Sequence, residues 1–204
     1  MTQRLIGLTG SLGSGKTTAA TYLRHRSIPV FDADQVARHL LTPGSPILET
    51  VINHFGPTIL DPQGNLDRLT LAEIIFRDPQ ERRWLEQLIH PQVRQQAQEF
   101  IAKHQDPVVV LDVPLLFEAG MEDLVTEIWV VSCGCEQQWQ RLRRRHPHWS
   151  PEHIQARLAQ QWPLAEKVAR ADRVLDNSGS LEWLYRQLEQ ALAGPAAQQG
   201  LQQG

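Results

Sequence analysis

RLIGLTGSLGSGKTT, residues 4–18, joins an apolar segment to a glycine-rich turn that ends in Lys-Thr. The apolar part, Leu5 to Thr9, predicts a buried strand. The three glycines of the turn permit positive φ and let the backbone approach an anion closely. From Lys16 onward the pattern is typical of a helix, whose free N–H groups and positive dipole end face the same anion. The spacing of residues 10–17 matches the phosphate-binding loop at every fixed position.

This loop predicts a site for a nucleoside triphosphate. Lys16 would reach the β- and γ-phosphates, and the hydroxyl of Thr17 would ligate Mg²⁺. A Gly/Ser turn that precedes a helix by chance is the alternative, and four matching positions after a strand argue against it. The residues expected to hold the nucleotide are Ser11, Leu12, Gly13, Ser14, Gly15, Lys16, Thr17 and Thr18.

Composition sets limits on the function. With 204 residues and 41% hydrophobic content, the chain can bury a core as one domain. A formal charge of −3 gives no overall reason to bind nucleic acid or an anionic membrane. No apolar run approaches the roughly 20 residues of a membrane span, and no secretory signal is recognisable, so we expect a cytoplasmic protein. Cys133 and Cys135 are too few for a structural zinc site and are interpreted as small residues at a strand end.

A second strand, Ile28 to Asp32, follows the first helix. Strand, helix and strand predict a right-handed parallel unit. Asp32 would then lie at the carboxyl end of the second strand, beside the phosphate loop, at the edge where open α/β sheets bind ligands. That position favours a functional role for Asp32. For Asp34 a helix cap and a functional role are equally open.

The stretch from residue 43 to 105 contains no convincing strand. Its helical spacing is interrupted by one turn, which suggests an inserted subdomain that holds the substrate. His90-Pro91 is predicted to separate two helices, and a histidine at such a boundary is usually a cap or a packed side chain. The helical segments are Ser45–Phe55, Leu69–Phe76, Pro79–Ile89 and Pro91–His104.

Three further strands follow. Pro107 to Asp112 is an apolar run typical of a strand buried on both faces, and Asp112 has the position of a carboxylate that holds Mg²⁺ directly or through water. The later strands are expected at Thr126–Ser132 and Ala171–Asn177. The closing helix, Ser180–Leu192, places Leu181, Leu184, Leu188 and Leu192 on one stripe, interpreted as core packing.

Glu136 to His146 predicts a strongly basic helix. Such a cluster is usually a solvated face or a nucleic-acid patch. Here the next helical stretch, Ser150–Trp162, has the placement of a lid in nucleotide kinases, so an arginine could close over the phosphates. Arg141 and Arg145 are four residues apart on one helical face, and we expect one of them to contact phosphate.

Taken together, the landmarks resemble the dephospho-coenzyme A kinase family over residues 4 to 192. They are LTGSLGSGKTT, the FDAD run followed by Ala37-Arg38, IHP at 89–91, DVPLLFE at 112–118, the basic helix from Gln138 to Arg145, and ADRVLDNSG at 171–179. The phosphate loop is shared by a vast superfamily, whereas DAD, HP and VPLLFE together are far more specific.

The resemblance implies a three-layer P-loop α/β fold with a five-stranded parallel sheet. Its single domain would span 1–192, with the core at 1–42, 106–142 and 171–192, a helical coenzyme-binding insertion at 43–105 and a lid at 143–170. A disordered tail is expected at 193–204. The implied substrates are ATP and dephospho-coenzyme A, with phosphorylation of the ribose 3′-hydroxyl.

The resemblance also implies residue roles. Asp32 would be the general base, Arg145 the lid arginine with Arg141 in support, and Asn177 a neighbour of the adenine. His90, Leu115 and Glu118 would line the dephospho-coenzyme A site. The chain departs from the family after Arg145, where HPHWS is one residue longer, so Arg144 is a further candidate for the lid arginine.

Two other functions are the alternatives. Another P-loop kinase, for shikimate, gluconate or a nucleoside monophosphate, would share the loop and lid but not the long helical excursion, HP and PLLFE. A GTP-dependent switch would carry an Asn/Thr-Lys-x-Asp segment, which this chain lacks. The sequence leaves open whether Asp34 or Asp112 contacts the metal, and a monomer or weak homo-oligomer is expected.

Overall fold

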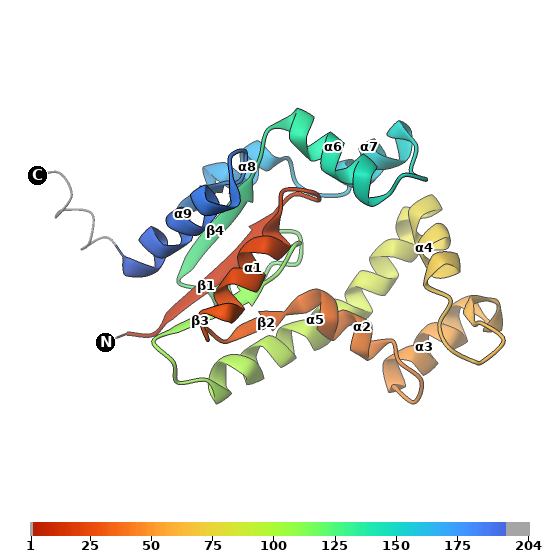
Figure 1. Ribbon diagram of the computed structural model, residues 1–204. Helices are drawn as coiled ribbons and strands as arrows, with labels where there is room; N and C mark the ends of the chain where they lie inside the picture. The colour runs from red at the N-terminus through yellow and green to blue at the C-terminus, as the bar shows by residue number, and fades with distance from the viewer. Residues whose placement is uncertain (1, 195–204) are drawn as a thin grey trace, which may run out of the picture. The chain divides into compact units, whose positions relative to one another are not determined.

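The computed structural model describes residues 2–194, and its strands form one parallel sheet in the order β2-β3-β1-β4-β5 (Figure 1). The predicted α/β class with a five-stranded sheet is therefore confirmed. β1 pairs with both β3 and β4, and β4 pairs with β5. The strands are β1 (Arg4–Gly10), β2 (Val30–Asp32), β3 (Val108–Asp112), β4 (Glu127–Ser132) and β5 (Arg173–Asp176).

The sheet order corrects one expectation about the second strand. We expected β2 to end beside the phosphate loop that follows β1, but β3 lies between β2 and β1. The physical reason is burial. Val109, Val110 and Leu111 of β3 are fully buried and need neighbours on both sides, whereas the three-residue β2 fits an edge.

Two helices cover one face of the sheet. α1 (Lys16–His25) and α9 (Leu181–Ala193) lie side by side in front of the strands in Figure 1. Ala19, Ala20 and Leu23 of α1 and Leu184 and Leu188 of α9 are fully buried there. They pack in one cluster with residues of the strands, which are Ile6, Leu8, Val110, Trp129, Val131 and Leu175. This cluster is the core that holds the phosphate loop's strand in place.

The opposite face packs against the segment that follows β3. A Cβ at Gly7 would lie 2.9 Å from Leu116 Cδ2 and 3.2 Å from Val125 Cγ2, so a larger residue here would force these two side chains to shift. The leucine stripe of α9 needs one correction. Leu184 and Leu188 are buried as expected, but Leu181 is 52% exposed because it is the first residue of the helix and lies at the surface.

Three short helices follow one another in the chain between β4 and β5. α6 (Cys135–Arg145) and α7 (Pro151–Ala159) correspond to the predicted basic helix and lid helix. α8 (Leu164–Ala169) was not expected as a helix of its own. Cys133 is buried at the end of β4 and Cys135 is exposed at the start of α6. Burial raises the pKa of the Cys133 thiol, which fits its interpretation as a small apolar residue.

The chain divides into two compact units. Among the described residues, one holds 2–31 and 104–194, and the other is Asp32–Lys103. The second unit is helical and contains most of the expected insertion at 43–105, whose coenzyme-binding role stays a prediction. Its elements are α2 (Ala33–Leu40), α3 (Pro46–Phe55), a 3₁₀ turn at Pro57–Ile59, α4 (Arg68–Arg77) and α5 (Pro79–Lys103).

Helix α5 corrects the prediction that His90-Pro91 separates two helices. It runs unbroken from Pro79 to Lys103 with Pro91 inside it. A proline inside a helix removes one backbone N–H donor and its ring crowds the carbonyl four residues earlier, and packing along a buried face can offset that cost. Leu85, Ile89, Val93 and Ala97 supply that face, at four-residue spacing.

The DAD triplet at residues 32–34 starts helix α2, but its N-cap is not the residue considered for that role. Asp32, not Asp34, is the N-cap of α2, because its Oδ1 accepts the Gln35 N–H at 2.9 Å. Asp34 is exposed in the first turn, where a negative charge favours the helix dipole. The tail expected to be disordered from 193 starts too early, because Ala193 is the last residue of α9 and Gly194 its C-cap; the residues from 195 lie outside the described part. Within residues 2–194, every helix falls short of the length and apolar character needed to cross a bilayer.

Candidate active site

The phosphate loop connects β1 to α1, and its glycines are required by the geometry. Gly13 and Gly15 have φ of 82° and 95°, in the left-handed region that disfavours other residues. A Cβ at Gly10 would lie 2.6 Å from the Val131 carbonyl oxygen and 2.7 Å from Ser14 Oγ. α1 begins directly after the loop, with Gly15 at its N-cap position. The end of α1 that attracts anions is therefore presented by the loop, as the sequence predicted.

Two side chains brace the loop at Ser14. The Asn177 side-chain amide donates to the Ser14 carbonyl oxygen at 2.8 Å, and Arg141 Nη1 donates to the same oxygen at 3.3 Å. Arg141 Nη2 also donates to the Asn177 carbonyl oxygen at 2.9 Å. A side chain at Gly15 would collide with the Asn177 amide nitrogen. The backbone of the loop is thus held by a closed set of contacts from α6 and from the end of β5.

Two glutamines hold the loop at Leu12. Gln138 Nε2 donates to the Leu12 carbonyl oxygen at 2.7 Å, and the Leu12 N–H donates to Gln161 Oε1 at 2.9 Å. Gln138 comes from α6 and Gln161 from the connection between α7 and α8. Neither glutamine was predicted as a site residue. Gln138 lies three residues before Arg141, so the helical spacing could have placed both on the face toward the loop, whereas Gln161 carries no such signal.

Lys16 and Asp112 meet directly. Lys16 Nζ donates to Asp112 Oδ1, and Arg24 Nη2 lies 3.7 Å from Asp112 Oδ2. The Asp112 side chain is only 5% exposed, and its residue pairs with Leu8 in the register of β3 against β1. The structure therefore brings together the lysine and the strand-end carboxylate that the sequence assigned to phosphate and metal. Since Lys carries three donors, the contact with Asp112 leaves Lys16 able to bind a phosphate oxygen.

Glu118 is held by a buried lysine, Lys167, which was not predicted as a site residue. Lys167 of α8 is fully buried, with Nζ 2.8 Å from Glu118 Oε1 and 3.1 Å from the Pro114 carbonyl oxygen. The Trp162 N–H donates to the same Glu118 oxygen at 2.7 Å. Glu118 Oε2 is buried and has no hydrogen-bond partner among residues 2–194. Glu118 thus fixes the segment after β3, and its predicted contact with substrate, like that of Leu115, stays a prediction.

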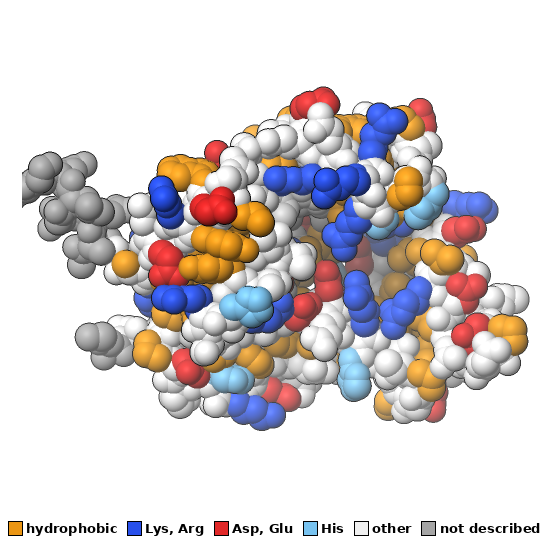
Figure 2. All heavy atoms as spheres, viewed as in Figure 1, with side chains coloured by type: hydrophobic (Ala, Val, Ile, Leu, Met, Phe, Trp, Pro, Cys, Tyr) orange, Lys and Arg blue, Asp and Glu red, His pale blue; other side chains and the backbone are white. Residues whose placement is uncertain are grey.

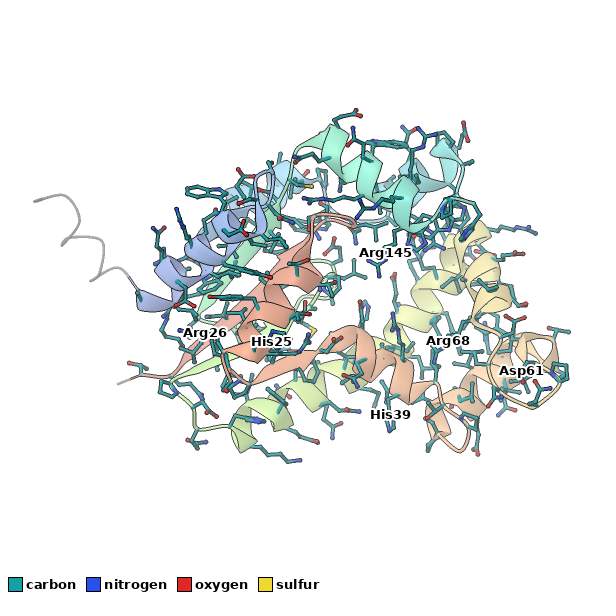
Figure 3. The ribbon with its side chains drawn as sticks, viewed as in Figure 1. His25, Arg26, His39, Asp61, Arg68 and Arg145 are labelled. Carbon is teal, nitrogen blue, oxygen red and sulfur yellow. The ribbon has the colours of Figure 1, made fainter. Side chains whose placement is uncertain are left out.

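The arginines of α6 divide into two kinds. Arg141 is half-buried and bound to the loop backbone, whereas Arg143, Arg144 and Arg145 are exposed in the last turn of α6. Figure 2 shows Lys and Arg side chains gathered over α6, and Figure 3 labels Arg145 at the end of that helix. Arg141 thus braces the loop, and which of Arg141, Arg144 and Arg145 contacts phosphate stays a prediction.

Asp32 and His90 belong to the helical unit. Asp32 is half-buried where β2 ends and caps α2, so its carboxylate already accepts one backbone N–H. His90 is half-buried on α5, and burial holds its pKa below the ordinary value while the charge of Glu86 opposes that change. The lowered pKa favours the neutral imidazole, in which one ring nitrogen donates and the other accepts a hydrogen bond. The roles of both residues toward the substrates stay predictions.

The fit of the site to Mg²⁺ follows from its oxygen donors. Thr17 offers a hydroxyl in the first turn of α1, and Asp112 a carboxylate at the end of β3. Among residues 2–194, no group of three or more His, Cys, Asp or Glu could cage a metal ion. Mg²⁺ is commonly held by one or two protein oxygens together with phosphate oxygens and water, so this donor set fits it.

Comparisons with known proteins bear on the whole chain. Residues 4–182 match the profile of a family described as dephospho-CoA kinase. A dephospho-CoA kinase of Synechococcus sp. strain JA-2-3B'a(2-13) is 50% identical, over 93% of this chain and 92% of its own length. The crystal structure of TT1252 from Thermus thermophilus has a TM-score of 0.80 and 36% identity, covering 96% of this chain and 99% of that one. A dephospho-CoA kinase structure from Campylobacter jejuni has a TM-score of 0.69 and 25% identity, covering 94% and 96%.

Proposed function

The chain belongs to the dephospho-CoA kinase family, and we propose that it transfers the γ-phosphoryl group of ATP to the ribose 3′-hydroxyl of dephospho-coenzyme A. ATP is the cosubstrate that the family implies. The observation that carries the proposal is the braced phosphate loop at residues 10–17, whose left-handed glycines and helix end form an anion cradle beside Lys16 and Asp112. The acceptor comes from the family assignment.

The cradle would bind the nucleotide through its backbone and through Lys16. Backbone N–H groups of the loop and of the first turn of α1 would surround the β-phosphate, while Lys16 would extend to the γ-phosphate. Because Asp112 already binds Lys16, the ammonium group would be oriented before the substrate arrives. Preorganised charge of this kind stabilises the transition state without reorganisation.

Thr17 and Asp112 would hold Mg²⁺, with Asp34 as the alternative to Asp112. When bound, Mg²⁺ would neutralise charge on the β- and γ-phosphate oxygens. Asp112 already lies between two cations, Lys16 and Arg24. These two cations balance the charge of the carboxylate that is proposed as a metal ligand.

Asp32 would act as the general base. Its carboxylate would accept the proton of the 3′-hydroxyl as that oxygen forms a bond to the γ-phosphorus, and the bond from phosphorus to the β,γ-bridging oxygen would break to release ADP. The support for this role is that β2 ends at Asp32, and the carboxyl ends of the parallel strands share one edge of the sheet. Arg145 would neutralise charge on the transferred group, with Arg144 as the alternative.

His90, Leu115 and Glu118 are proposed to contribute to the dephospho-coenzyme A site, and Asn177 to lie near the adenine of ATP. The neutral state of His90 suits a hydrogen bond to the acceptor rather than a charge contact. The contacts of Glu118 with Lys167 and Trp162 suggest that its contribution is to hold Leu115 and its neighbours in position.

The test is a phosphorylation assay with ATP, Mg²⁺ and dephospho-coenzyme A, following coenzyme A formation by chromatography. Shikimate and gluconate serve as comparison acceptors, and Lys16→Ala, expected to lose about 10²-fold or more of turnover, is the inactive control. Of the three acceptors, we expect only dephospho-coenzyme A to be phosphorylated. Faster turnover of another acceptor would replace the proposed substrate. Near-normal turnover by Lys16→Ala would contradict the loop's role.

Cytoplasmic location and a monomeric or weakly associating state complete the proposal. Fractionation of cells expressing the tagged protein tests the location. Light scattering at several concentrations tests the oligomeric state.

A further inference from the structure

The connection between α7 and α8 binds two different loops through adjacent residues. Gln161 Oε1 accepts the Leu12 N–H of the phosphate loop at 2.9 Å. The next residue, Trp162, donates its N–H to Glu118 Oε1 at 2.7 Å. Glu118 belongs to the segment that follows Asp112 at the end of β3. One short connection therefore joins the loop expected to hold the phosphates to the segment that follows the expected metal ligand.

The attachment at Trp162 is firm. Lys167 is fully buried and pairs with Glu118 at 2.8 Å, so separating them would leave a charge without compensation. The Trp162 ring stacks on Phe117 with centroids 5.5 Å apart and planes 10° apart. The Arg170 guanidinium lies 4.7 Å over the Trp162 ring on the α8 side. Charge, stacking and burial thus all fix this end of the connection.

The attachment at Gln161 is weak by comparison. It is a single neutral hydrogen bond from a side chain that is only partly buried. Water can replace such a bond at little net cost. Gln160, the preceding residue, is exposed, whereas Gln161 is the residue that accepts the hydrogen bond from Leu12. The connection therefore has one fixed end and one end that can release.

We propose that Gln161 is a positioning residue for phosphoryl transfer: it holds α7 to the phosphate loop through Leu12, with the Glu118–Lys167 pair as the fixed pivot. While the hydrogen bond is made, α7 stays against the loop, so water has less access to the γ-phosphate. When it breaks, α7 is released while α8 stays in place. The identity of the transferred group in this inference rests on the proposed function.

Hydrogen exchange on the full chain without nucleotide tests directly whether the hydrogen bond from Leu12 to Gln161 acts as a latch that holds α7 to the phosphate loop. Gln161→Ala should raise exchange about 5-fold at the Leu12 amide and along α7, since one net hydrogen bond corresponds to roughly this factor. Gln161→Met, which keeps the volume but cannot accept, should do the same. Gln160→Ala is the matched control and should leave both unchanged. Unchanged protection at Leu12 and α7 in both Gln161 variants would overturn the proposal, whatever the acceptor proves to be.

The second measurement is the ratio of ATP lost to hydrolysis by water to ATP used for phosphoryl transfer. With ATP and Mg²⁺, Gln161→Met should raise the ratio of ATP hydrolysed to coenzyme A formed by about 5-fold at an unchanged melting temperature, because the same net hydrogen bond no longer keeps water out. A purely structural role would lower the melting temperature without changing this ratio. A wild-type ratio in Gln161→Met would overturn the proposal, whereas absence of coenzyme A from the wild-type reaction would overturn the proposed function and leave the exchange result to decide the latch.

Discussion

The side-chain amide of Asn177 donates to the carbonyl oxygen of Ser14 at 2.8 Å, which ties the end of β5 to the middle of the phosphate loop. Asn177 is only 4% exposed and packs where any side chain on Gly15 would collide with it. The loop conformation therefore depends on a residue more than 160 positions away along the chain, as well as on its own glycines.

Asn177→Ala should weaken nucleotide binding by about 5-fold, because the loop loses one of its two braces at Ser14 while Arg141 remains. Isothermal titration with ATP measures the change. Tripolyphosphate, which has no adenine, separates bracing from an adenine contact, since only bracing predicts weaker binding of both ligands. The exposed Asn53→Ala on α3 is the control. Equal affinity of Asn177→Ala and wild type for tripolyphosphate would contradict the bracing role.

Lys167→Met should lower the free energy of unfolding by about 3 kcal/mol, since it leaves Glu118 buried without its partner. For a chain of this size the melting temperature should fall by roughly 6–12 °C. Adding Glu118→Gln to the same variant should recover part of the loss because it removes the unpaired charge. The exposed Lys103→Met is the control. A double variant less stable than Lys167→Met would show that the pair is not the cause.

Asp32→Asn should lower kcat about 10²-fold with little change in the affinity for ATP, because an amide cannot accept the hydroxyl proton. Asparagine is as good an N-cap as aspartate, so α2 should keep its start and the variant should fold. Steady-state kinetics with varied ATP and acceptor measures both effects, with the exposed Asp34→Asn alongside. A higher KM for the acceptor at normal kcat would make Asp32 a binding residue instead.

Arg145→Ala and Arg141→Ala should impair the enzyme in different ways, one through kcat and the other through KM for ATP and stability. The exposed Arg145 should matter for the transition state, so its loss should lower kcat by about 10²-fold at constant stability. The loss of Arg141, which binds Ser14 and Asn177, should raise KM for ATP and lower the melting temperature. Arg144→Ala decides the alternative: a large kcat effect there, with none at Arg145, would move the assignment by one residue.

Stability of the helical unit should depend on pH through His90. Burial lowers its pKa in the folded chain, so the unfolded chain binds the proton more readily. The contribution of neutral His90 is therefore fully present above the unfolded value near 6.5 and is lost as pH falls through the lower folded-state pKa. Urea titrations at several pH values between 7.5 and 5 should show this loss as a fall in the free energy of unfolding. His90→Gln should make the free energy of unfolding depend less steeply on pH. An unchanged slope, or an equal change in the exposed His25→Gln, would contradict this origin.

The structure and the sequence agree where the determining pattern is local. The glycines at 13 and 15 adopt positive φ, and the strands at 4–10, 108–112 and 127–132 lie within one or two residues of the apolar runs. The prediction was wrong at His90-Pro91, because a buried face along α5 outweighed the proline. It was wrong at Leu181 because periodicity marks a helical face but not where that face reaches the surface.

By itself, the sequence determined the phosphate loop, the buried strands and the family, because glycine conformation, apolar runs and fixed spacing act over a few residues. Only the tertiary structure decided the order of the strands, the cap at Asp32, and the contacts of Gln161 with Leu12, Asn177 with Ser14 and Lys167 with Glu118. These contacts join residues far apart in the chain, and a glutamine, asparagine or lysine carries no periodic mark of the partner that folding brings to it.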